Sequence, residues 1–190
     1  DIVSIGGPMV EFNQTEPGAP RYLQGFGGDT SNMVIAAARS GARSGYVTRL
    51  GDDEFGRMFL DLWRAEGVDC STVAIDGSAH TAVYFVTHGS QGHVFSYLRA
   101  GSAASRLSPA TLPEGILSTA RIVHASGISQ AISASACDAV IQAFESARAS
   151  GRQVAFDSNL RLKLWPLARA RAMIGAAAAL SDYFFPSLED

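Results

Sequence analysis

Short apolar runs alternate with longer segments of helical character along most of this chain. The apolar runs predict strands near residues 2–5, 46–48, 73–75, 122–124, 154–157 and 183–185. Segments with helical spacing or helix-forming composition lie at residues 33–40, 52–66, 133–149 and 167–180. Because strands separated by helices of this length pair in parallel, we predict an α/β fold with a mostly parallel sheet flanked by helices.

A different pattern, with a period of two, occupies residues 81–98. Alternating runs at residues 81–86 and 93–98 flank Gly-Ser-Gln-Gly at residues 89–92, which predicts a β-hairpin. The hairpin and the segment around Met9 to Tyr22 do not fit the parallel layer, and they indicate a small β-sheet lid. We expect an α/β core made of residues 1–8, 23–78 and 102–190, and a lid made of residues 9–22 and 79–101.

Composition and charge exclude several classes of protein. Hydrophobic residues make up 47% of the 190 and charged residues 17%, which is too apolar for a disordered chain. The net charge of −3 offers no basic surface for nucleic acid, and no apolar run is long enough to cross a bilayer. Cys70 and Cys137 lie far apart, without disulfide-framework or metal-site spacing, which favours a reducing, cytoplasmic location.

The sequence also lacks two common nucleotide-binding motifs. A Walker A loop needs a lysine followed by serine or threonine, but Lys163, the only lysine, precedes Leu164. The first predicted strand is not followed by the three spaced glycines of a dinucleotide-binding fold, which argues against a nicotinamide-dependent dehydrogenase. The four histidines have no metal-ligand spacing, so we expect no direct metal ligand among them.

Two polar motifs lie at ends of predicted elements. Residues 27–32, Gly-Gly-Asp-Thr-Ser-Asn, open a helix, where glycines allow close backbone approach and the helix start offers free N–H groups. Residues 156–161, Phe-Asp-Ser-Asn-Leu-Arg, follow a strand at the edge where open α/β sheets bind ligands. Local chemistry also allows simpler interpretations: a glycine turn with Asp29 or Thr30 as helix N-cap, and an Asx turn.

A third motif lies on the predicted hairpin. Tyr97 and Arg99 share a strand parity, with Tyr84 on the opposing strand, so Tyr97 and Arg99 point to one face of the lid. An aromatic hydroxyl and a guanidinium together suit a ligand that carries hydroxyls and a carboxylate. The alternative is a solvated edge strand with an incidental arginine.

Taken in order, the motifs resemble those of the ribokinase-like (PfkB) sugar kinases across essentially the whole chain. Residues 27–41 resemble the first family signature, and residues 49–56 resemble its usual sequel with one inserted residue. Tyr-Leu-Arg at residues 97–99, Ser-Gly-Ile-Ser at 126–129 and the run at 156–165 are similar to the subgroup that phosphorylates 2-keto-3-deoxygluconate.

The resemblance implies ATP-dependent, Mg²⁺-assisted phosphorylation of a sugar acid, most closely 2-keto-3-deoxygluconate to its 6-phosphate. Arg99 and Arg161 neutralise the carboxylate in this interpretation, and the lid closes over the sugar. The implied acceptor-binding residues are Gly28, Asp29, Thr30, Asn32, Tyr84, Tyr97, Arg99 and Arg161. The residues that the resemblance associates with nucleotide or metal are Asn159, Ser187 and Asp190. The implied partners are therefore a small sugar acid and ATP.

At two places the sequence departs from the family pattern, which changes the activity expected of this chain. No Gly-Ala-Gly-Asp loop, which supplies the catalytic base in the family, follows Asp157, so no catalytic residue is expected in this chain. Ser187 stands where the family has asparagine. We therefore expect the N-terminal portion of a kinase, without most of the nucleotide site, that is inactive by itself.

Two other functions are compatible with these residues. A neutral sugar or nucleoside such as ribose, fructose or adenosine could be the acceptor, although it gives no reason to pair two arginines. A non-catalytic sugar-acid-binding protein could keep the same fold. The apolar residues Val83, Phe85, Val94 and Phe95 also leave a lid face on which two copies could associate.

Overall fold

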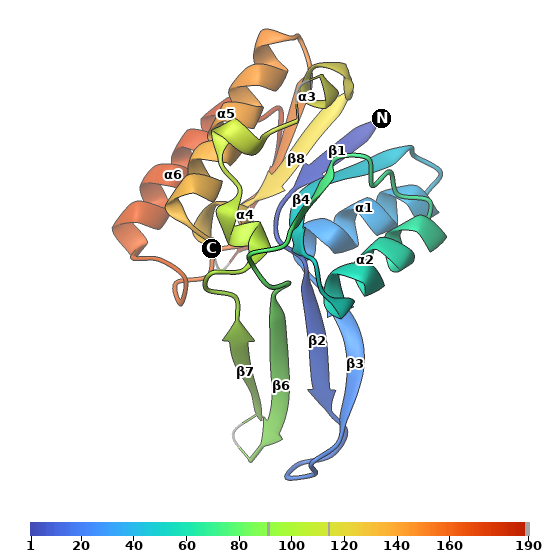
Figure 1. The fold of residues 1–190 in the computed structure, drawn as a ribbon. Coiled ribbons are helices and arrows are strands. Elements are labelled where there is room, and N and C mark those ends of the chain that lie inside the picture. Colours follow the sequence, from blue (N-terminus) through green and yellow to red (C-terminus); the bar gives the residue numbers. More distant parts are fainter. Residues whose placement is uncertain (91, 114, 189–190) are drawn as a thin grey trace.

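A six-stranded parallel sheet forms the centre of the molecule (Figure 1). The computed structural model describes residues 1–90, 92–113 and 115–188. Within them the strand order is β10-β9-β8-β1-β4-β5, and every neighbouring pair is parallel. The bounds are β1 (Ile2–Ile5), β4 (Ser44–Gly51), β5 (Val73–Asp76), β8 (Ile122–Ser126), β9 (Gln153–Asp157) and β10 (Tyr183–Phe185). The α/β architecture expected from the sequence is confirmed.

Helices cover both faces of this sheet, as the alternating pattern predicts (Figure 1). One side carries α1 (Asp29–Arg39) and α2 (Glu54–Ala65). The other side carries α5 (Ala134–Ala149) and α6 (Leu167–Leu180), with the short α3 (Ile116–Thr119) and α4 (Gly127–Ala131). Two short 3₁₀ helices, η1 (Ala103–Arg106) and η2 (Pro109–Thr111), follow the lid. None of the helices among the described residues is both long enough and apolar enough to traverse a lipid bilayer.

Two apolar clusters hold the helices to the sheet. On the α5 side, Phe144 and Phe156 are fully buried and meet edge to face. On the α2 side, Phe59 and Trp63 stack on one another, and the Trp63 indole N–H donates to the Ser31 hydroxyl at 2.9 Å. Burying each large side chain stabilises the fold by about 1.5–3 kcal/mol, so these clusters fix the elements that carry the polar motifs.

The lid is a four-stranded sheet that projects from one end of the core (Figure 1). Its order is β3 (Tyr22–Gly27), β2 (Met9–Gln14), β6 (Val83–Gly89) and β7 (Gly92–Leu98). The expected hairpin is the β6–β7 pair, and Gln91 of its turn lies outside the described residues. Residues 23–27 also belong to the lid, although the sequence pattern assigned them to the core, because β3 pairs with β2 along its whole length.

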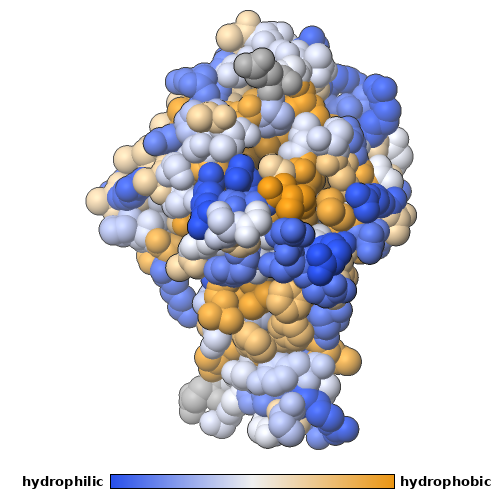
Figure 2. Space-filling view, viewed as in Figure 1, coloured by the Kyte–Doolittle hydropathy of each residue, from blue (hydrophilic) through white to orange (hydrophobic). Residues whose placement is uncertain are grey.

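The four apolar residues expected on one face of the lid lie on two different faces. Val83, Phe85 and Val94 share one face, where Phe85 stacks on Phe12 with ring centroids 5.2 Å apart. Phe95 lies on the opposite face, because successive strand residues alternate sides, and its ring stacks with Tyr97. Figure 2 shows hydrophobic residues gathered over the lid between the core and the strand ends.

Candidate functional site

The start of α1 depends on a glycine with a left-handed backbone. Gly28 is the N-cap residue and has φ 111°, a conformation that L side chains rarely adopt. The simpler alternative, in which Asp29 or Thr30 is the N-cap, is wrong, since α1 already begins at Asp29 and no side chain caps it. Asp29 instead uses its Oδ1 atom to accept a hydrogen bond from the Thr30 backbone N–H at 2.9 Å.

The other polar residues of this helix start face different surroundings. Thr30 is fully buried, and its hydroxyl is hydrogen-bonded to the Tyr46 hydroxyl at 2.8 Å. Burial raises the pKa of Tyr46, so this pair stays neutral and joins α1 to β4. Asn32 is exposed one turn into the helix. The structure therefore leaves Asp29 and Asn32 accessible to a ligand and places Thr30 in the core.

The turn after β9 reaches across to the same helix start. The Asn159 backbone N–H donates to Asp157 Oδ1 at 3.1 Å, which is the Asx turn considered from the sequence. The Asn159 side-chain amide donates to Asp29 Oδ2 at 2.8 Å. Asn159 thus meets the expected acceptor-binding group, although the resemblance associates it with the nucleotide or metal. Arg161, two residues on, is exposed and donates from Nη1 to the Leu160 carbonyl at 2.8 Å.

Two lid tyrosines stack on one another, and one of them, Tyr84, packs against Gly27. Tyr84 and Tyr97 are cross-strand partners whose rings stack with centroids 5.8 Å apart. A Cβ atom added at Gly27 would lie 2.6 Å from the Tyr84 hydroxyl oxygen, so only glycine lets the tyrosine approach the backbone this closely. Tyr84 and Gly27, 57 residues apart in sequence, therefore border one site.

Arg99 has an unusual environment for a charged side chain. Its guanidinium carbon lies 5.2 Å from the Tyr97 ring centroid, which confirms that the two side chains share a lid face. Nε and Nη2 are 3.3 and 3.1 Å from the Met9 sulfur, a weak acceptor, and Nη1 is shielded from solvent without a partner among the described residues. Burial lowers the pKa of Arg99, while Tyr97 and Asp29 oppose that shift. The site therefore holds a cation that lacks a strong acceptor.

Glu11 is a member of this site that the sequence analysis missed. The Tyr84 hydroxyl donates to Glu11 Oε2, and the Asn13 amide donates to Glu11 Oε1 at 3.3 Å. Burial and the Glu11 carboxylate raise the pKa of Tyr84, so its hydroxyl keeps its proton. The signal that could have found Glu11 is its register opposite Tyr84, but that register depends on parallel pairing of β2 with β6.

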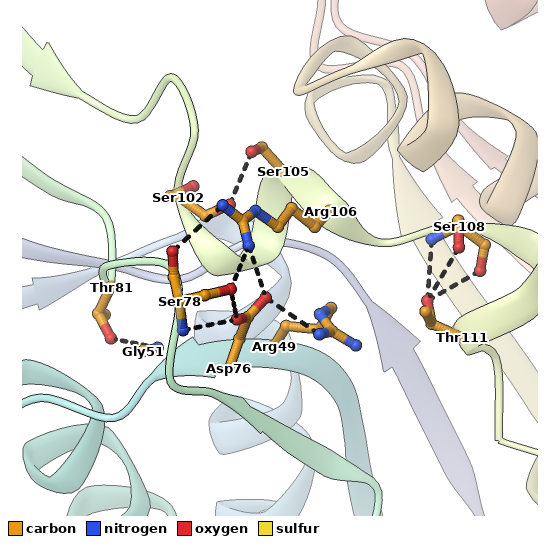
Figure 3. A network of polar contacts seen from close by, with 10 residues as sticks. All are labelled: Arg49, Gly51, Asp76, Ser78, Thr81, Ser102, Ser105, Arg106, Ser108 and Thr111. Carbon is orange, nitrogen blue, oxygen red and sulfur yellow. Dashed lines mark hydrogen bonds and ion pairs between the residues drawn. The ribbon is translucent and has the colours of Figure 1, made fainter.

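A polar network holds the two segments that connect the β6–β7 hairpin of the lid to the core (Figure 3). Asp76, at the end of β5, accepts from Arg49 at 3.1 Å and from Arg106 of η1 at 3.3 Å through Oδ2. Its Oδ1 accepts from the hydroxyl and backbone N–H of Ser78 at 2.8 and 3.0 Å. Hydrogen bonds from Ser78, together with Arg49, hold the pKa of Asp76 well below its usual range. One carboxylate therefore anchors the segment that precedes β6 and the segment that follows β7.

Two of the residues expected near nucleotide or metal, Asn159 and Ser187, follow the ends of the paired strands β9 and β10. Asn159 contacts Asp29, as described above, whereas Ser187 is exposed beyond β10. Asp190 lies outside the described residues. Across residues 1–90, 92–113 and 115–188, no three histidine, cysteine or acidic side chains gather as a group that could hold a metal ion. These residues therefore do not fit a complete metal site, and we derive no step through one.

The chain is similar in sequence to proteins that are named as sugar kinases. The chain is 40% identical over 185 residues to 2-dehydro-3-deoxygluconokinase of Thermoproteus tenax, covering 91% of this chain and 54% of that protein. It is 37% identical over 174 residues to fructokinase-2 of Solanum habrochaites, covering 88% and 52%. The chain thus spans about half the length of the curated relatives it matches.

Solved structures show the same fold. The PfkB protein from Polaromonas sp. JS666 superposes with a TM-score of 0.95 at 36% identity, covering all of this chain and 66% of that one. Fructokinase with bound ATP from Xylella fastidiosa has a TM-score of 0.87 at 27% identity, covering 96% and 56%. The model of the pfkB family carbohydrate kinases matches residues 1–190. With its parallel sheet, its lid and this match along the whole sequence, the chain belongs to the pfkB family of carbohydrate kinases.

Proposed function

We propose that the whole protein is an ATP-dependent kinase for a sugar acid, and that this chain supplies most of its acceptor site. The acceptor that we favour is 2-keto-3-deoxygluconate, phosphorylated on its 6-hydroxyl. The observation that carries this proposal is Arg99, whose guanidinium contacts a thioether and a tyrosine ring and has no stronger hydrogen-bond acceptor among the described residues. The relative from Thermoproteus tenax, which bears the name of this activity, supports the choice.

The chemistry of Arg99 favours an anionic acceptor over a neutral one. A carboxylate gives a guanidinium two strong, charge-assisted hydrogen bonds, whereas a sugar hydroxyl gives it one weaker bond. A hydrogen bond to a charged group contributes about 1.5–3 kcal/mol, and more where water is excluded. Since Nη1 of Arg99 is buried without a partner among the described residues, a bound carboxylate relieves this cost. We propose Arg161, on the turn tied to Asp29, as the second cation.

The rest of the acceptor site is polar and suits a polyol. We propose that Asp29 and Asn32, with the backbone at Gly28, bind sugar hydroxyls at the start of α1. Tyr84, held by Glu11, and Tyr97 cover the sugar from the lid. When the lid closes it excludes water, so that the phosphoryl group passes to the sugar hydroxyl and not to solvent.

ATP is the proposed phosphoryl donor of the whole protein. The Xylella fastidiosa fructokinase was solved with ATP, and the chain shares its fold. Mg²⁺ neutralises charge in phosphoryl transfer generally. Among the described residues, no three histidine, cysteine or acidic side chains form a group that could hold a metal ion. Since the chain has no Gly-Ala-Gly-Asp loop after Asp157, we propose that the rest of the whole protein supplies the catalytic base and the phosphate-binding amides, and that residues 1–190 alone bind acceptor without turnover.

A kinase for a neutral sugar is the second candidate, because fructokinase-2 of Solanum habrochaites matches the chain at 37% identity. Phosphorylation of 2-keto-3-deoxygluconate, fructose, ribose and adenosine by the full-length protein, with ATP and Mg²⁺, separates the candidates. We expect the highest kcat/KM with the sugar acid. A preference for fructose, ribose or adenosine contradicts the proposal, and tight sugar-acid binding without turnover indicates a non-catalytic binding protein.

We also propose that two copies associate through their lids. Val94 and Leu98 of β7 are 56% and 58% exposed on one lid face, next to the apolar Phe85. β7 is an edge strand of its sheet, and exposed edges with apolar side chains favour association.

A further inference from the structure

Asn159 has a backbone conformation that calls for a physical explanation. Its φ is 33°, and it is the only residue other than glycine with a positive φ among the described residues. Asparagine tolerates this left-handed region better than most residues, particularly in an Asx turn such as the one formed with Asp157 Oδ1. The turn thereby directs the Asn159 side chain away from its own strand and toward α1.

The side chain of Asn159 has a defined partner there. Its amide nitrogen lies 2.8 Å from Oδ2 of Asp29, a residue 130 positions earlier. The other carboxylate oxygen of Asp29 accepts from the Thr30 backbone N–H at 2.9 Å. Each oxygen of Asp29 therefore has one donor, and together the two hydrogen bonds set the orientation of the carboxylate.

The turn that carries Asn159 is itself fixed by close packing. A Cβ atom added at Gly127, the first residue of α4, would lie 2.1 Å from the Ser158 carbonyl oxygen. The Ser158 backbone N–H donates to the Phe185 carbonyl of β10 at 3.2 Å. Since the turn is held by two neighbouring elements, Asn159 presents its amide to Asp29 from a rigid support.

We propose that Asn159 is a positioning residue of the acceptor site, which acts by holding the Asp29 carboxylate toward the sugar. The same hydrogen bond ties the turn that carries Arg161 to the start of α1, so it sets the spacing between the hydroxyl-binding and carboxylate-binding ends of the site. This inference rests on the proposed acceptor site, but not on the charge of the acceptor. It gives Asn159 a role on the acceptor side of the site.

Asn159→Gly in the full-length protein is the first test, because glycine adopts the positive φ readily and removes the side chain that carries the amide. We expect the acceptor KM to rise about tenfold, while the ATP KM changes by less than about twofold. Asn159→Ala is the matched variant that adds backbone strain. It should lower Tm further than glycine does, with a similar rise in acceptor KM.

Asn159→Asp gives a readout that a purely structural role does not produce. Two carboxylates then face each other at hydrogen-bond distance, and they can bond only when they share a proton. We expect its kcat/KM for the acceptor, relative to the unmodified protein, to be lowest at pH 8 and to recover as the pH falls toward 5. A pH-independent ratio contradicts the proposal.

A double-mutant cycle with Asp29→Asn tests whether Asn159 acts through Asp29. We expect Asn159→Gly to add less than about twofold to the acceptor KM in the Asp29→Asn background. If the effects of the two substitutions on the acceptor KM multiply, the inference is wrong. It is also wrong if Asn159→Gly raises the ATP KM and leaves the acceptor KM unchanged.

The proposed function and this inference fail separately. If the full-length protein phosphorylates fructose instead of the sugar acid, the proposed function fails and Asn159 is judged on the fructose KM. If a sugar binds without turnover, its calorimetric Kd replaces KM in each comparison. If no sugar binds or reacts, both fail.

Discussion

At the scale of single residues, His124 makes the stability of the fold depend on pH. His124 is 7% exposed on β8, and its Nδ1 lies 2.8 Å from the Ser4 hydroxyl. Burial lowers its pKa to about 4, against an opposing effect of Asp29. The folded protein therefore holds His124 neutral at a pH where the unfolded chain binds a proton.

The lowered pKa of His124 predicts acid-sensitive stability. Its contribution is full above the unfolded pKa of about 6.5 and is lost as pH falls toward 4, because the unfolded state then binds the extra proton. We expect this residue alone to remove about 2 kcal/mol of unfolding free energy between pH 7 and pH 5. Urea denaturation of His124→Asn should show a flatter dependence over this interval.

The control for that experiment is His93→Gln, which changes an exposed histidine of the lid. It should retain the pH dependence of the unmodified chain. An equal slope in His124→Asn and the unmodified chain would show that His124 is not the group responsible.

Other residues show what local patterns cannot predict. The polar motifs singled out Asp29, Tyr84, Tyr97 and Arg99 as candidates because their residue types are informative without a partner. Glu11 was missed because its role depends on Tyr84 in another strand. The partner of Asn159 was missed for the same reason, since Asp29 lies 130 residues away.

At the scale of elements, apolar periodicity was sufficient for the parallel strands and for the four longer helices. Apolar periodicity failed where pairing with a neighbouring strand determines whether a segment forms a strand or which face a side chain occupies. Residues 23–27 contain glycines and look like a connection, yet they form most of β3 because β2 offers a complete partner. Phe95 was assigned to the wrong lid face because strand alternation, and not hydrophobicity, sets its direction.

The carboxylate of Asp76, which anchors the segments before β6 and after β7, provides a prediction at this scale. Asp76→Asn removes the charge shared by Arg49 and Arg106, and leaves the largely buried Arg49 without its ionic partner. We expect Tm to fall by about 5–10 °C, and the amides of residues 77–82 and 99–106 to exchange hydrogen faster. Differential scanning calorimetry and hydrogen-exchange mass spectrometry measure these effects.

Asp52→Asn is the matched control for Asp76. Asp52 pairs with Arg57 at 3.7 Å, but both side chains are more than half exposed. We expect Tm to change by less than about 2 °C, since exposed ion pairs contribute little. Similar losses in the two variants would contradict an anchoring role for Asp76.

At the scale of the whole molecule, the lid predicts association. The full-length protein should have the mass of two copies by light scattering at micromolar concentration. The double variant Val94→Lys/Leu98→Lys should have the mass of one, because charges on the lid face oppose its burial. Ile75→Lys, on the exposed edge strand β5, is the control and should not change the mass. A single-copy mass for the unmodified protein contradicts the lid interface.

The most direct test of the account is the acceptor preference of the full-length protein with and without Arg99. We measure kcat/KM for 2-keto-3-deoxygluconate and for fructose in the unmodified protein, in Arg99→Met, and in Arg57→Met as a surface control. Removal of the guanidinium should lower kcat/KM for the sugar acid about 100-fold and change the fructose value by less than about threefold. Equal losses for both sugars, or an unchanged preference, would contradict a carboxylate site at Arg99.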